Sequence, residues 1–192
     1  MWLLPLIACP AAQLGVELPP GGVDAISHED LRRDVRLLTG ADPAAEFAGR
    51  LAQMAMVPAA PPAGVPTSAT CAARGQGPRP GGKPALLLAP WPANPDTATA
   101  AAALISVAKA WDLSGGAGGR VTLCLLAAGT PLVETLAGLP PGVALGVGPL
   151  ASGAAHPEGA CFVADPPDPA RPAERINYTD LQSRVKTLFG EL

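Results

Sequence analysis

The stretch ALLLAPWPANPDTATAAAALISVAKAWDLSGGAGGRVTLCLLA, residues 85–127, decides the fold of this chain. It begins and ends with continuously apolar runs, Ala85–Ala89 and Val121–Ala127, which are typical of strands buried on both faces. Residues 96–111 between them predict a helix. A strand, a helix and a second strand in this order indicate a βαβ unit with two parallel strands. The apolar face of the expected helix carries Leu104, Val107, Ala108 and Trp111.

The alternation of helices and strands continues toward the C-terminus. We expect a short helix at 131–139 and strands at 143–147 and 160–164. The last helix is expected to begin at Thr179, with Gln182 completing a capping box. The chain is therefore predicted to be an α/β domain, a three-layer sandwich with a mostly parallel (mixed) sheet flanked by helices and reduced in size.

The N-terminal half reads as two helices followed by an irregular segment. Ser27 is a good N-cap for a helix over 28–39. The pair Asp42-Pro43 predicts the start of a second helix, which ends near Pro58. Residues 58–84 hold seven prolines and five glycines, so we expect an irregular, low-complexity insert there.

The length of the chain indicates how many domains it holds, and its charge indicates which partners it can bind. The 192 residues leave room for one domain, which we place at 24–192, after an apolar segment and tether at 1–23. The formal net charge is −3, and the 13 basic residues form no run. Binding to a phosphate backbone needs clustered positive charge, so no nucleic-acid partner is expected.

The N-terminal residues contain a lipidation pattern. Leu6-Ile7-Ala8-Cys9 has the form of a bacterial lipobox, in which Cys9 is lipidated. The apolar run before it is too short to span a bilayer, which needs about 20 residues. We expect an exported protein of the cell envelope or periplasm, in contact with the membrane only through a lipid anchor. The alternative is an apolar tail with an incidental cysteine.

The other cysteines are Cys71, Cys124 and Cys161. Their spacing does not match that of a zinc site. Cys124 lies in an apolar run and is expected to be a small, buried hydrophobic residue. A bridge between Cys71 and Cys161 is compatible with export, but nothing in the sequence selects it.

Familiar enzyme motifs are missing from the sequence. It contains no G-x-S-x-G. The glycine-rich run 115–119 precedes a strand instead of following one, so it reads as a flexible turn and not as a dinucleotide site. The two histidines are His28, expected to be exposed in the first turn of a helix, and His156, in a loop near Glu158. Neither completes a recognisable catalytic group.

Four segments in the correct order resemble the zinc-dependent aminopeptidases of the aminopeptidase Y and bacterial leucyl aminopeptidase type (peptidase family M-twenty-eight). Residues 26–38 resemble the opening helix of that family, and residues 44–51 resemble its second helix. Residues 96–111 resemble the helix that follows its first metal-binding strand, and residues 175–178 resemble its closing segment. The resemblance covers most of residues 24–192, with deletions.

The resemblance implies a site built for two zinc ions, but most of its ligands are replaced. Pro90-Trp91-Pro92 stand where the family has His-x-Asp, and Gly129-Thr130 stand where it has two glutamates. Asp96 matches the bridging aspartate and is the one ligand position retained. No Asp, Glu or His occurs in residues 135–155, where a further ligand is due. We therefore expect no intact metal site, no catalytic residue and no cofactor. Asp96 is then expected to cap its helix.

The combined interpretation is a catalytically inactive, aminopeptidase-like domain that is exported and serves as an interaction or structural module, with an unidentified protein or peptide as its partner. A pocket is expected at the carboxyl ends of the strands, next to Pro90. The first alternative is a residual hydrolase with one metal held by Asp96, His156 and Asp165. The second alternative is a decaying open reading frame. The residues expected to line the pocket are Trp91, Asp96, Thr130 and His156.

Overall fold

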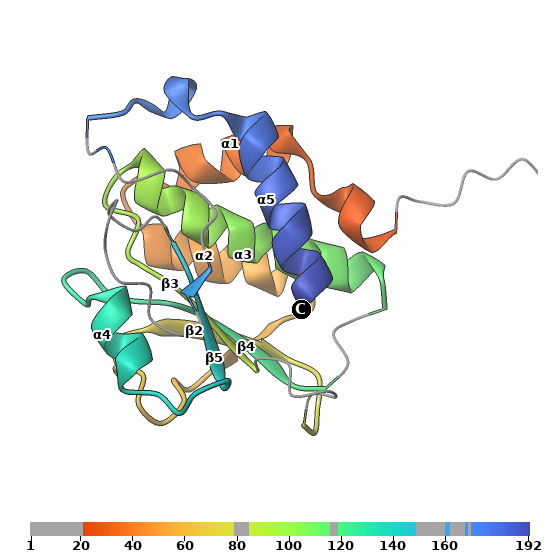
Figure 1. Cartoon of the computed structure of the whole chain (residues 1–192), viewed down its shortest axis with the longest axis vertical. Helices are drawn as coiled ribbons and strands as arrows, with labels where there is room; N and C mark the ends of the chain where they lie inside the picture. The colour runs from red at the N-terminus through yellow and green to blue at the C-terminus, as the bar shows by residue number, and fades with distance from the viewer. Residues whose placement is uncertain (1–20, 79–84, 116–118, 149–159, 162–167, 169) are drawn as a thin grey trace, which may run out of the picture.

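The computed structural model describes residues 21–78, 85–115, 119–148, 160–161, 168 and 170–192 (Figure 1). These residues form one mixed β-sheet with helices on both faces. The helices are α1 (His28–Leu38), α2 (Pro43–Ala52), α3 (Pro95–Leu113), α4 (Leu132–Ala137) and α5 (Tyr178–Glu191), with 3₁₀ turns η2 (Gly22–Ala25) and η4 (Ala173–Arg175). The strands are β1 (Val57–Ala59), β2 (Thr70–Arg74), β3 (Leu86–Ala89), β4 (Val121–Leu125), β5 (Ala144–Val147) and β6 (Ala160–Cys161).

The described strands lie in the order β1-β2-β4-β3-β5-β6. Strands β4, β3, β5 and β6 are parallel, whereas β2 runs antiparallel to both of its neighbours. The β3–α3–β4 segment is the expected crossover unit, with Leu87 opposite Leu123 in the parallel pair. The predicted fold class, an α/β domain with a mixed sheet flanked by helices, is confirmed.

Helix α3 is buried on nearly all sides. It contacts β3 and β5 and also α1, α2 and α5. The consecutive residues Ala100–Ala103 are all 0% exposed, and four consecutive residues cover a full helical turn. The expected single apolar face is therefore only part of the buried surface, because helices pack against α3 on the side away from the sheet. No helix among the described residues is long and apolar enough to cross a bilayer.

Ion pairs tie the C-terminal part of α3 to its neighbours. Lys109 Nζ lies 2.5 Å from Asp30 Oδ2 of α1, and Asp112 Oδ1 lies 2.8 Å from Arg74 Nη1 at the end of β2. Burial acts to raise the pKa of Asp30, but the hydrogen bond and charge of Lys109, together with Arg33, outweigh it and lower that pKa. The negative form of Asp30 thus favours the contact between α1 and α3.

The opposite face of the sheet has a thinner cover. It consists of the short helix α4 and the connection between β1 and β2 (Figure 1). Its core is a second apolar cluster, smaller than the one under α1, α2, α3 and α5. The sheet is thus the middle of three layers, one of them thin. The cluster under α4 comprises Val65, Ala69, Cys71, Leu86, Leu88, Cys124, Leu126, Leu132, Leu136, Leu139 and Ala144.

The expectation of an irregular insert at 58–84 is wrong for two segments. Strand β1 overlaps its start, and β2 lies within it at residues 70–74. Both strands consist mainly of residues with weak strand preference, and they form because β2 pairs with the buried strand β4. Residues 79–84 lie outside the described part of the chain.

Pro58 occupies a particular position in β1. Cys71 and Cys124 are directly opposite each other in β2 and β4, with Cα atoms 4.2 Å apart, which marks a pair without mutual backbone hydrogen bonds. The backbone groups of Cys71 therefore point toward Ala59 of β1. One residue along, the backbone nitrogen and carbonyl of Pro58 must point away from β2, toward the outer edge of the sheet formed by the described strands.

Two of the predicted helix starts are confirmed and one is wrong. The side chains of Ser27 and Asp42 accept backbone hydrogen bonds at the N-termini of α1 and α2, as expected. Helix α5 is capped by Asn177 and not by Thr179. Gln182 makes a tertiary contact instead, because its Nε2 donates to the carbonyl of Ile26 at 2.7 Å.

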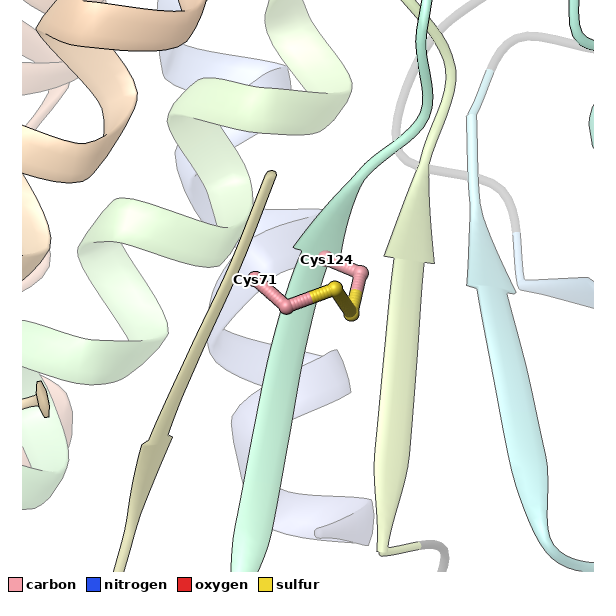
Figure 2. The surroundings of a disulfide bond; sticks show 2 residues. All are labelled: Cys71 and Cys124. Carbon is pink, nitrogen blue, oxygen red and sulfur yellow. A yellow bond between two sulfur atoms is a disulfide. The ribbon is translucent and has the colours of Figure 1, made fainter. Parts of the chain in front are cut away.

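A disulfide bond joins the antiparallel strands β2 and β4 (Figure 2). It links Cys71 and Cys124, so Cys124 is buried as expected but is not a free thiol. The alternative pairing of Cys71 with Cys161 is wrong. Cys71 lies in a proline-rich segment of the sequence, so the strand β2 was not predicted there. This strand brings Cys71 opposite Cys124.

Removing this disulfide should destabilise the domain. The bond closes a loop with a sequence separation of 53 residues, and bonds of this kind typically contribute about 2–4 kcal/mol. We expect the Cys71→Ala/Cys124→Ala variant to lose stability in that range in urea unfolding, and the wild type to lose a similar amount in reductant. A disulfide-linked peptide containing Cys161 in a non-reducing digest would contradict the assigned pairing.

Candidate functional site

The carboxyl ends of β3 and β4 carry the residues that the resemblance aligns with metal ligands. The two strands are adjacent and parallel, so the segments that follow them leave the sheet at the same edge. Pro90 and Trp91 follow β3 directly, and Gly129-Thr130 lie in the turn after β4.

The residues after β3 are packing residues. Trp91 is partly buried against the larger apolar cluster, and Pro92 is buried. A Cβ atom added to Gly148, after β5, would lie 3.3 Å from Cδ of Pro90. The side chains at positions 90–92 therefore fill space, and none of them carries a group that binds zinc.

The turn after β4 has a backbone that favours glycine. Gly129 has φ +80°, a conformation that residues with a side chain rarely adopt. The N–H of Thr130 donates to the carbonyl of Ala127 at 3.1 Å, which closes the turn. A glutamate at position 129 would be strained, so this turn is not shaped to present a ligand there.

Asp96 has a different role from the expected helix cap. The N-cap of α3 is Asn94, whose side chain accepts the N–H of Thr97 at 2.9 Å in a reciprocal capping box. Asp96 is only 1% exposed. Its Oδ2 accepts the backbone N–H of Asp168 at 2.6 Å, and its Oδ1 lies 3.7 Å from Nη1 of Arg171. The carboxylate therefore joins the start of α3 to the segment before α5.

These contacts determine what Asp96 can do chemically. One oxygen of the carboxylate is committed to a backbone donor, and the other faces a guanidinium group. A divalent cation at Asp96 would compete with the N–H of Asp168 and would be repelled by Arg171. The described residues around Asp96 therefore do not supply the zinc ligands that the resemblance implies.

Several of the predicted residues lie outside the described part of the chain. These are Cys9, His156 and Asp165. His28 is described and is exposed, as expected. Within the described ranges there is no group of three or more His, Cys, Asp or Glu side chains placed to hold a metal ion.

Three cavities lined by described residues lie away from the carboxyl ends of β3 and β4. They have volumes of about 260, 370 and 440 Å³, and neither Trp91, Asp96 nor Thr130 lines any of the three. The largest lies at the amino ends of the parallel strands, the edge opposite Asp96. The expected pocket at the carboxyl ends stays a prediction, because its fourth residue, His156, is not described.

One buried charged pair was missed by the sequence interpretation. Asp34 of α1 is 2% exposed, and its Oδ1 lies 2.9 Å from Nη2 of Arg50 in α2 and 3.2 Å from Nε of Arg33. Burial raises the pKa of Asp34 by more than Arg50 and Arg33 lower it. The burial of Asp34 could have been predicted from the sequence, because Asp34 lies next to Val35 on the buried face of α1. The pair joins two helices and lines no described cavity.

Comparison with known proteins found no matching family model, no matching curated protein and no matching solved structure. The resemblance to zinc aminopeptidases therefore stays a prediction from the sequence.

The roles of Asn94 and Asp96 can be separated by mutation. Asn94→Ala removes a helix cap and should cost about 1 kcal/mol. Asp96→Ala leaves the N–H of Asp168 without its acceptor and should cost about 1–3 kcal/mol, with faster amide hydrogen exchange at Asp168. Asp96→Asn keeps an acceptor and should fall between wild type and Asp96→Ala. Equal exchange rates at Asp168 in Asn94→Ala and Asp96→Ala would contradict this assignment.

Proposed function

We propose that this chain is a catalytically inactive, exported relative of the zinc aminopeptidases that acts by binding a protein or peptide. The contact of Asp96 with Arg171 and with the N–H of Asp168 carries the proposal. Asp96 is the one position at which the resemblance retains a metal ligand. Its carboxylate is engaged in holding the polypeptide together, with a positive charge where a cation would compete.

The surroundings of Asp96 give further support. Zinc sites in proteins are built from several imidazole, thiolate or carboxylate ligands held at fixed geometry. Prolines stand at positions 90 and 92, and a glycine with positive φ stands at 129. Substitutions of this kind remove ligands and also reshape the loops that would present them. A domain without this chemistry would act through binding.

The disulfide supports the exported location. Such bonds form and persist mainly in oxidising compartments outside the cytosol. The Cys71–Cys124 bond joins two strands in the middle of the fold, where it contributes to stability and not to a reactive site. We propose the cell envelope or periplasm as the location, with lipidation at Cys9 as the only membrane attachment.

The absence of peptidase activity is directly testable. We expect the full chain to show no turnover of amino-acid arylamides, either as purified or after loading with Zn²⁺, because positions 90, 92, 129 and 130 supply no ligands or base. Turnover that a chelator abolishes would contradict the proposal. If that turnover is also lost in Asp96→Asn, His156→Ala and Asp165→Ala, the residual one-metal hydrolase is the correct function. Turnover unchanged in all three variants would identify a contaminating peptidase.

The lipid anchor can be tested independently of catalysis. Expressed in a bacterial host behind a complete signal sequence, the wild type should partition into detergent, and its intact mass should begin at a lipidated Cys9. Cys9→Ser should be released into the aqueous phase with unchanged thermal stability, because Cys9 precedes the domain expected at 24–192. A wild-type protein that retains Met1 and stays aqueous would contradict the anchor.

A further inference from the structure

The largest of the three cavities has the features of a binding site for a small ligand. Its volume is about 440 Å³, within the range of small-molecule pockets in proteins. It lies at the amino ends of β3, β4 and β5, on the face of the sheet that α4 covers. Its floor includes Leu86 and Thr122, both less than 10% exposed, and its apolar walls include Pro62, Leu139 and Val143.

Thr122 contributes a hydroxyl group without a partner. The residue is only 6% exposed and lines the cavity. It shares the α4 face of strand β4 with Cys124, two residues along, because side chains alternate between the faces of a strand. Among the described residues, nothing forms a hydrogen bond with this hydroxyl. Its oxygen is not one of the fully buried polar atoms without a partner, so it is accessible from the cavity and available to a ligand.

Arg120 contributes a positive charge to the same cavity. It precedes β4 by one residue, and its backbone N–H donates to the carbonyl of Gly77 at 2.8 Å, which holds it beside the end of β2. Strand alternation places it on the face of Thr122, about 6.6 Å away along the strand. The side chain is exposed and forms no ion pair within the described part of the chain. None of the described residues that line the cavity is acidic.

We propose that this cavity binds a monocarboxylate with an apolar body, such as a medium-chain fatty acid. The carboxylate accepts a hydrogen bond from the hydroxyl of Thr122 and pairs with the guanidinium of Arg120. The apolar body packs against Leu86, Leu139 and Val143. One cation and one hydroxyl match a single negative charge, whereas a phosphate group would need more donors.

This site is separate from the edge of the sheet that carries Asp96. The proposal of a carboxylate site is therefore independent of the proposal of an inactive, peptide-binding domain, and either can be correct without the other. Loss of peptidase-like chemistry at Asp96 says nothing about Arg120, and ligand binding at Thr122 would be compatible with an active or an inactive enzyme.

The test is a titration of the isotopically labelled full chain with octanoate, followed by NMR. We expect saturable shifts of the methyl groups of Leu86, Leu139 and Val143. Octanol and octylamine have the same apolar chain without the negative charge, and both should bind at least about tenfold more weakly, the loss expected for a hydrogen bond to a charged group.

Three variants test whether the charge of Arg120 and the hydroxyl of Thr122 bind octanoate. Arg120→Gln and Thr122→Val should each weaken octanoate about tenfold, while Arg120→Lys retains part of the affinity. Arg32→Gln is the matched control, because Arg32 is an equally exposed arginine on α1, on the other face of the sheet. Arg120 is exposed, so its variants should unfold like the wild type, which keeps the test valid even if Thr122→Val destabilises the fold.

Four results would overturn the proposal. They are the absence of saturable shifts, shifts confined to α1 and α5, octanol binding as tightly as octanoate, and equal weakening by Arg32→Gln and Arg120→Gln.

Discussion

Close packing around α3 is the contact on which the rest of the structure depends. A run of alanines lets the sheet approach this helix from one side and α1 and α5 from the other, because alanine adds little thickness to a helix. Trp111, near its end, meets Phe189 of α5 with ring centroids 6.4 Å apart. The buried start of the helix holds Asp96, and the last turns carry the ion pairs to α1 and β2. Helix α3 thus fixes the positions of α1, α2 and α5 and of the candidate site.

The two faces of the sheet are unequal, and the difference explains where the cavity and the disulfide lie. Four long or medium helices cover one face. The other face has α4, of six residues, and a proline-rich connection. This thin cover leaves space at the amino ends of the strands, beside Leu86. The Cys71–Cys124 bond lies on this same thin face and supplies a covalent link where the apolar core is smallest.

The sequence predicts the parallel strands well, because they are continuously apolar. It also predicts α1 and α2 well, because Ser27 and Asp42 are clear helix caps. It fails at β2, whose residues Thr70–Arg74 resemble a loop and become a strand only through pairing with β4. The role of Asp96 also depends on tertiary contacts, since its partners lie 72 and 75 positions away along the chain. The same holds for Arg120 and Thr122, which look like ordinary strand residues until α4 is seen to leave them uncovered.

The orientation of Pro58 has a consequence for the behaviour of the protein at high concentration. An edge strand with free N–H and C=O groups can recruit a strand from another molecule, which is how sheets grow into aggregates. In β1 the outward-facing position belongs to a residue that has no N–H group, and the strand is only three residues long. A second chain approaching this edge would lack a donor at the centre of the strand. Pro58 makes β1 hard to predict from the sequence, and the same residue protects that edge of the sheet against intermolecular pairing.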